Sequence, residues 1–92
     1  GNQVLGIFSV STGGITGTVA DPRLILIAAL KSASTSIVLC HNHPSGNLKP
    51  SQADESLTRK IKQACYYIDI TVMDHLIISS ESYFSFADEG LL

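Results

Sequence analysis

The sequence of 92 residues has few charged side chains, and this shortage excludes several classes of protein. Only 15% of its residues are charged, whereas about a quarter are charged in an average soluble domain. Intrinsic disorder is excluded, because disordered chains combine low hydrophobicity with high charge and 45% of these residues are apolar. The net charge of −2 predicts no strong nucleic-acid binding, since phosphate-backbone binders need a basic surface.

The sequence also lacks a long apolar run and has only two cysteines. No apolar run reaches the length of about 18 residues that a transmembrane helix needs, so we expect no membrane partner. Two cysteines, Cys40 and Cys65, are too few for a disulfide framework. We interpret both as reduced core residues and expect the protein to be cytoplasmic. A composition rich in apolar residues and poor in charges also favours contact with a partner chain. A homo-oligomer is therefore one of the possible states of the protein.

Acidic residues are nearly absent from the first half of the sequence. The charged residues before His41 are Asp21, Arg23 and Lys31. The first glutamate is Glu55. Asp21 precedes Pro22, a pair typical of a helix start, because Asp is a good N-cap and Pro suits the first helical position. We therefore interpret Asp21 as a helix cap.

The periodicity of the apolar residues predicts a single domain with five strands and two helices. Alternation indicates strands over residues 4–10, 15–20, 36–41, 71–79 and 82–86. Helical spacing indicates one helix over residues 21–31, apolar on most of its surface and therefore buried, and another over 50–68. Because both faces of the third strand are apolar, we expect a central strand covered on both sides. The order β-β-α-β-α-β-β predicts an α/β or α+β fold with one mixed sheet.

The chemical signal is a pair of histidines followed by a serine and an aspartate, in the spacing His41-x-His43-x7-Ser51-x2-Asp54. The two histidines lie at the end of the third strand, and residues i and i+2 of an extended segment point to one side. Asp54 lies three residues before Leu57, on the apolar face of the second helix. Two imidazoles and one carboxylate with an open fourth position form the ligand set of a catalytic zinc site.

Structural interpretations of the same residues stay open. Ser51 and Asp54 have the spacing of a capping box, and a carboxylate near a helix N-terminus is stabilised by the helix dipole. Capping and metal binding are compatible, because one side chain can do both. His75, in the fourth strand, is either a hydrogen-bonded core histidine or a residue that helps a carboxylate such as Asp74 to orient a metal ligand.

Together these residues resemble the metalloprotease motif of the JAB/MPN (JAMM) domains, Glu…His-x-His-x7-Ser-x2-Asp. Residues 41–46 and 50–54 are similar to the RadC branch of that family. Residues 74–77 and 83–86 also resemble the end of RadC proteins, so that the resemblance covers nearly the whole chain. It implies a JAB/MPN-like mixed sheet with two helices, in a layout comparable to that of cytidine deaminases.

The resemblance implies a metalloprotease-type hydrolase with a zinc ion held by His41, His43 and Asp54. In such enzymes a zinc-bound water attacks an amide or isopeptide bond of a peptide substrate. The residue at the position of Ser51 stabilises the oxyanion, and a glutamate that precedes the His-x-His segment acts as general base. No glutamate precedes His41 here. We therefore expect residues 1–92 to be one RadC-type domain that lacks the upstream glutamate segment and the N-terminal helix-hairpin-helix region.

Two other functions stay open. The missing glutamate and the low charge also fit a non-catalytic MPN-like interaction module that binds a partner or a second copy of itself. The RadC name suggests a part in DNA repair, which this domain would play through partners, because its charge balance argues against direct binding of a duplex.

Overall fold

The computed structural model describes residues 21–43 and 46–92, and the strands predicted over 4–10 and 15–20 lie outside them. The described elements, in chain order, are α1 (Pro22–Lys31), β1 (Ser36–Asn42), α2 (Gln52–Tyr67), β2 (Thr71–Ile78) and β3 (Tyr83–Ser85). Both predicted helices and the last three predicted strands are confirmed to within two residues at their ends. The fold class is mixed α+β, as predicted.

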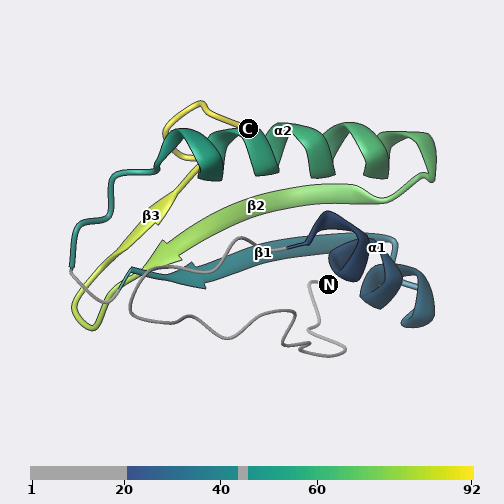
Figure 1. Ribbon diagram of the computed structural model, residues 1–92, viewed down its shortest axis with the longest axis horizontal. Coiled ribbons are helices and arrows are strands. Elements are labelled where there is room, and N and C mark those ends of the chain that lie inside the picture. Colours follow the sequence, from purple (N-terminus) through teal and green to yellow (C-terminus); the bar gives the residue numbers. More distant parts are fainter. Residues whose placement is uncertain (1–20, 44–45) are drawn as a thin grey trace.

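The described strands form one mixed sheet in the order β1-β2-β3. β1 and β2 are parallel, and β3 returns antiparallel to β2. Both parallel strands run toward the end of the molecule where α2 begins (Figure 1). Residues that follow β1 are therefore brought next to the first turn of α2.

Both helices begin at the caps that the sequence predicts. The Asp21 carboxylate accepts a hydrogen bond from the Arg23 main-chain N–H at 2.9 Å, and Pro22 is the first residue of α1. Ser51 caps α2 and forms a complete capping box with Asp54. None of the helices in the described part of the chain is long and apolar enough to cross a membrane.

The core lies between the two helices and one face of the parallel strands. Its buried apolar side chains are those of Ala29, Ile61, Cys65, Ile70 and Val72. Alternate residues of β1 pack toward this core, while Val38 and Cys40 face away and are exposed. The predictions of a β1 covered on both faces and of a core Cys40 are therefore wrong for the described residues, whereas Cys65 is buried as predicted.

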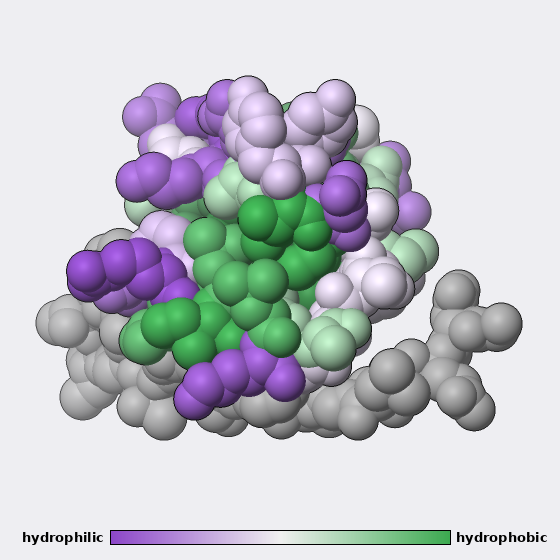
Figure 2. All heavy atoms as spheres, turned by 90° about the vertical axis from the view of Figure 1, so that its right-hand side faces the viewer, coloured by the Kyte–Doolittle hydropathy of each residue, from purple (hydrophilic) through white to green (hydrophobic). Residues whose placement is uncertain are grey.

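Helix α1 is less buried than its composition predicts. Ala29 is 4% exposed, but Leu24, Ile27 and Leu30 are 47%, 48% and 57% exposed. Among the described residues, α1 packs on one side only, and Figure 2 shows apolar side chains gathered on the side of the molecule where it lies. The prediction of a well-buried helix is therefore wrong for three of its large apolar residues.

Strand β2 changes phase at Met73, and this decides where His75 points. The parallel register advances from Val72 directly to Asp74 while β1 advances by one residue. Strict alternation would put Val72 and His75 on opposite faces, yet they are only 6% and 2% exposed, and Met73 is 47% exposed. An extra residue in one strand re-aims the side chains that follow it. The irregularity therefore turns His75 into the interior.

The assignment of the core can be tested by a substitution at Ile61. Its side chain is fully buried, so we expect Ile61→Ala to lower the free energy of unfolding by about 2–5 kcal/mol through lost burial and a new cavity. Urea unfolding followed by circular dichroism measures this loss. Lys62→Ala, at the exposed next position, is the control and should change the free energy by less than about 0.5 kcal/mol. Equal losses in the two variants would contradict the assigned core.

Candidate metal centre

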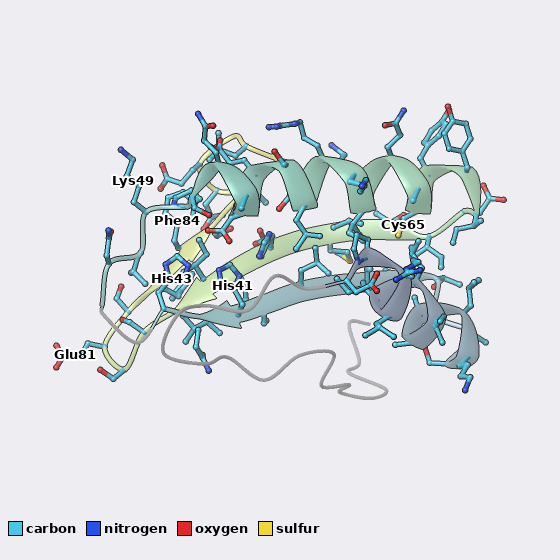
Figure 3. All side chains as sticks on the ribbon, viewed as in Figure 1. His41, His43, Lys49, Cys65, Glu81 and Phe84 are labelled. Atoms are coloured by element: carbon cyan, nitrogen blue, oxygen red, sulfur yellow. The ribbon has the colours of Figure 1, made fainter. Side chains whose placement is uncertain are left out.

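The end of β1 presents two histidine rings to the same side. The His43 main-chain N–H donates to the Ile78 carbonyl at 3.0 Å, so the pairing with β2 continues just past the end of β1. This extended backbone keeps His41 and His43 on one face, as their spacing predicts. Their Nε2 atoms lie 2.8 Å apart, and Figure 3 shows the rings near each other below the start of α2.

The capping box places Asp54 beside these rings. Ser51 Oγ accepts from the Asp54 N–H at 3.1 Å, and Asp54 Oδ2 accepts from the Ser51 N–H at 2.7 Å. The same carboxylate has Oδ1 at 3.2 Å from His41 Nε2 and Oδ2 at 3.5 Å from His43 Nε2. Capping and the approach to the histidines therefore use one side chain, and the cap fixes the direction in which the carboxylate points.

The spacing of these atoms fits a small divalent cation. One ligand atom from each of His41, His43 and Asp54 lies within 4.8 Å of the others. Zinc bonds of 2.0–2.1 Å in a tetrahedron put neighbouring ligand atoms about 3.3 Å apart. The two Nε2 atoms lie 2.8 Å apart, and the nearest Asp54 oxygen is Oδ1 at 3.2 Å for His41 and Oδ2 at 3.5 Å for His43, so the ligand atoms lie close to that spacing. The structure thus brings together the three residues predicted to bind a metal, and their role as ligands stays a prediction.

Hydrogen bonding orients His43 for such a role. Its Nδ1 lies 2.7 Å from the carbonyl oxygen of Asn47. A carbonyl can only accept, so Nδ1 carries the proton and Nε2 of the neutral ring presents a lone pair. This lone pair faces the other acceptor atoms of the cluster, an arrangement that a cation stabilises.

The protonation states also suit a metal site. Burial, helped by the neighbouring His43, lowers the pKa of His41 below 6.5 against the opposing pull of the Asp54 charge. Partial burial acts to raise the pKa of Asp54, but hydrogen bonds from Ser51 and the nearby histidines leave it below 3.8. Near neutral pH His41 is therefore neutral and Asp54 is charged, as metal ligands must be.

His75 lies directly behind the candidate ligands. It is 2% exposed, its Nε2 lies 2.9 Å from His41 Nδ1, and its Nδ1 is hydrogen-bonded with Thr58 Oγ1. The ring stacks on Phe86 with centroids 4.5 Å apart and planes at 11°. Burial, with a smaller effect of His41, lowers the pKa of His75 to about 4. It is thus a hydrogen-bonded core histidine and also a neighbour of a candidate ligand.

Asp74 is placed differently from His75. Its carboxylate accepts from the Ser85 hydroxyl at 2.6 Å, the Ala87 N–H at 3.0 Å and the His75 main-chain N–H at 2.7 Å. Burial acts to raise the pKa of this carboxyl, but these hydrogen bonds hold it below 3.8. Asp74 therefore orders the chain around β3, and among the described contacts it is the His75 ring that meets the candidate ligand His41.

Thr58 is the part of this site that the sequence interpretation missed. It is 1% exposed and donates its hydroxyl proton to the Asp54 carbonyl at 2.8 Å. A signal for it exists, because Thr58 lies four residues after Asp54 and so on the same face of the helix. Glu81, at the turn between β2 and β3, points away from the two histidine rings (Figure 3).

Comparisons with known proteins match this chain to one family. The family described as "RadC-like JAB domain" matches residues 1–91. A "UPF0758 protein" of Flavobacterium johnsoniae is 49% identical over 98% of this chain and 39% of its own length. Proteins of the same description from Streptococcus gordonii and Lactococcus lactis are each 43% identical, over 96% and 98% of this chain. The chain spans only 39–40% of the length of these relatives.

The buried His75 predicts an acid-sensitive stability of the metal-free chain. Its pKa is about 4 when folded against an ordinary value of 6.5, so between these pH values the unfolded chain binds a proton that the folded chain does not. We expect the free energy of unfolding to fall by roughly 3 kcal/mol from this residue as the pH drops from 7 to 4. Urea unfolding in EDTA at several pH values measures the loss. His75→Phe should lack this component, and an equally steep loss in that variant would refute the assignment to His75.

Proposed function

Because this chain belongs to the RadC-like JAB domain family, we propose that it is a zinc-dependent hydrolase domain that cleaves an amide or isopeptide bond. The observation that carries the proposal is the convergence of His41, His43 and Asp54 on one point. Two imidazole nitrogens and one carboxylate oxygen suit zinc and leave a fourth position open, as in catalytic sites. The names of the relatives give no activity, so the proposal rests on the site.

Each residue of the candidate site has its own role in the proposed hydrolysis. A zinc ion, when bound, supplies the Lewis acidity that makes water a nucleophile near neutral pH. His41, His43 and Asp54 hold it, with the carboxylate kept in place by the capping box. Capping uses an acceptor lone pair of the Ser51 hydroxyl. Ser51 therefore combines its cap with the role that the family resemblance implies, donating its O–H to the oxygen that becomes charged at the attacked carbonyl.

A second candidate is a non-catalytic interaction module. It is favoured by the exposed apolar side chains of α1, because Leu24, Ile27 and Leu30 are 47%, 48% and 57% exposed and such a patch is typical of a surface that binds a partner. Asp21, the acid that does precede His41, is committed to capping α1 and to an ion pair with Arg23 at 2.7 Å. Glu81 points away from the site (Figure 3). The two candidates agree on metal binding and differ on turnover.

The same proposal extends to the substrate, the compartment and the partners of the domain. We propose a peptide or isopeptide as the substrate, because the family resemblance implies one. We propose the cytoplasm as the compartment, because Cys40 and Cys65 are free thiols. A link to DNA repair would then run through partner proteins, since the net charge of −2 does not favour direct binding of a duplex.

Metal content tests the site itself. We expect about one zinc per chain after reconstitution at pH 7, because the three ligands of His41, His43 and Asp54 match a zinc site. Elemental analysis after gel filtration measures it. His41→Ala and Asp54→Asn should lose the metal, and Asn at that position still offers an oxygen to the Ser51 N–H. Glu55→Gln, the adjacent acid in α2, is the matched control and should keep the zinc. A wild-type chain without metal would refute the site.

Turnover separates the two candidates. We expect the zinc-loaded protein, produced from its full-length gene, to hydrolyse some members of a panel of isopeptide-linked peptides, with the activity lost in EDTA and lowered about 10²–10³-fold by Ser51→Ala, because an oxyanion donor is removed. Ser51→Gly also lacks the hydroxyl but costs the cap only a few tenths of a kcal/mol, against about 1 kcal/mol for Ala, so it should lose as much activity as Ser51→Ala if the donor matters. Product formation is followed by mass spectrometry. A fully zinc-loaded chain that cleaves none of the peptides would favour the interaction module.

A further inference from the structure

A third histidine, His75, is built into the interior behind the candidate metal centre and would not itself touch the ion. It is 2% exposed, lies between His41 and Thr58, and is held in its plane by stacking on Phe86. Buried polar groups are costly unless each finds a partner. The two ring nitrogens of His75 both have one, and the direction of these two bonds follows from the groups at their ends.

The direction of the hydrogen bonds is fixed at Thr58. Its hydroxyl has one proton, and the Asp54 carbonyl, 2.8 Å away, can only accept it. The contact between Thr58 Oγ1 and His75 Nδ1 must then use the N–H of the histidine. A neutral imidazole has a single N–H, so His75 Nε2 is an acceptor and receives the Nδ1–H of His41 at 2.9 Å. The Nε2 atom of His41 is left with a lone pair that lies 2.8 Å from Nε2 of His43, and two such acceptors need a cation or a shared proton between them.

We infer that His75 and Thr58 are positioning residues that set the tautomer and ring orientation of His41, and so control metal affinity at the proposed zinc site. This inference rests on the proposed function. The relay from His41 through His75 and Thr58 ends on the main chain of Asp54, which is itself a candidate ligand. Two candidate ligands, one from β1 and one from α2, are thereby connected by hydrogen bonds that pass through His75 of β2.

The relay also explains a threonine in the middle of a buried helix face. Thr58 is 1% exposed in α2, where an apolar side chain would pack at lower cost. Its hydroxyl bonds back to the carbonyl four residues earlier, a common habit of threonine in helices. That bond uses the hydroxyl's only proton, which leaves the oxygen free to accept from His75.

Zinc affinity, measured by competition with a chromophoric chelator, tests the relay. His75→Phe keeps a flat aromatic ring, although a larger one, that can stack on Phe86, and it removes both nitrogens. Thr58→Val removes the hydroxyl with little change in volume. Each should weaken zinc binding about 10–100-fold, the usual effect of losing the partner of a metal-bound histidine. His75→Gln and Thr58→Ser, which restore donors and acceptors, should recover most of the affinity.

Ser85→Ala is the matched control. Ser85 is 5% exposed and hydrogen-bonded to Asp74 in the same sheet, but it lies outside the relay. Its zinc affinity should stay within about twofold of wild type, far below the 10–100-fold expected for a lost ligand partner. Wild-type affinity in His75→Phe, or a loss in Ser85→Ala as large as in His75→Phe, would overturn the inference.

Nitrogen-15 NMR of the histidine rings gives a readout that is independent of metal. In the metal-free chain we expect His41 and His75 to be protonated at Nδ1, and Thr58→Val to change this tautomer pattern. A His41 ring that carries no proton on Nδ1 would overturn the relay even if the chain binds zinc. If the wild-type chain binds no zinc but shows the expected tautomers, the proposed function fails and the relay stands.

Discussion

The parallel pairing of β1 with β2 is the constraint on which the candidate site depends. It runs both strands toward the first turn of α2 and sets Leu39 opposite His75 and His41 opposite Ile77. Neighbouring residues across such a ladder point to the same side. His41 and His75 therefore come within hydrogen-bonding distance although they are 34 residues apart in sequence. Without this register the motif at the end of β1 would lack its support from the interior.

Local patterns predicted the described elements and the candidate ligands. The helix caps, the His-x-His spacing and the inward face of α2 each depend on neighbouring residues, and the structure brings His41, His43 and Asp54 together. Features that depend on distant contacts were not predictable in this way. The exposure of Cys40 follows from which face of the sheet the helices cover, and the burial of both Val72 and His75 follows from a register shift at Met73 that alternation cannot show.

The geometry of Asp54 shows why capping and metal binding, the two interpretations of its sequence motif, are compatible. One carboxylate oxygen accepts from the Ser51 N–H, and the other faces His41. A helix N-terminus stabilises a negative charge, and so does a cation. A bound cation would therefore favour the same charge that the helix N-terminus favours. The start of α2 is therefore part of the candidate metal centre. Its first turn is ordered by the capping box without any bound ion.

The change of phase at Met73 divides β2 into two segments with different tasks. Val72, before it, belongs to the apolar core with Ala29 and Ile61, whereas His75 and Ile77, after it, lie behind the histidine pair. Because the extra residue absorbs the mismatch between the two alternations, each half of the strand can keep its own side chains inward. Substitutions in the core half of β2 can therefore change its packing without turning His75, whereas deletion of one residue between Val72 and His75 would turn one of these two side chains to the opposite face of the sheet.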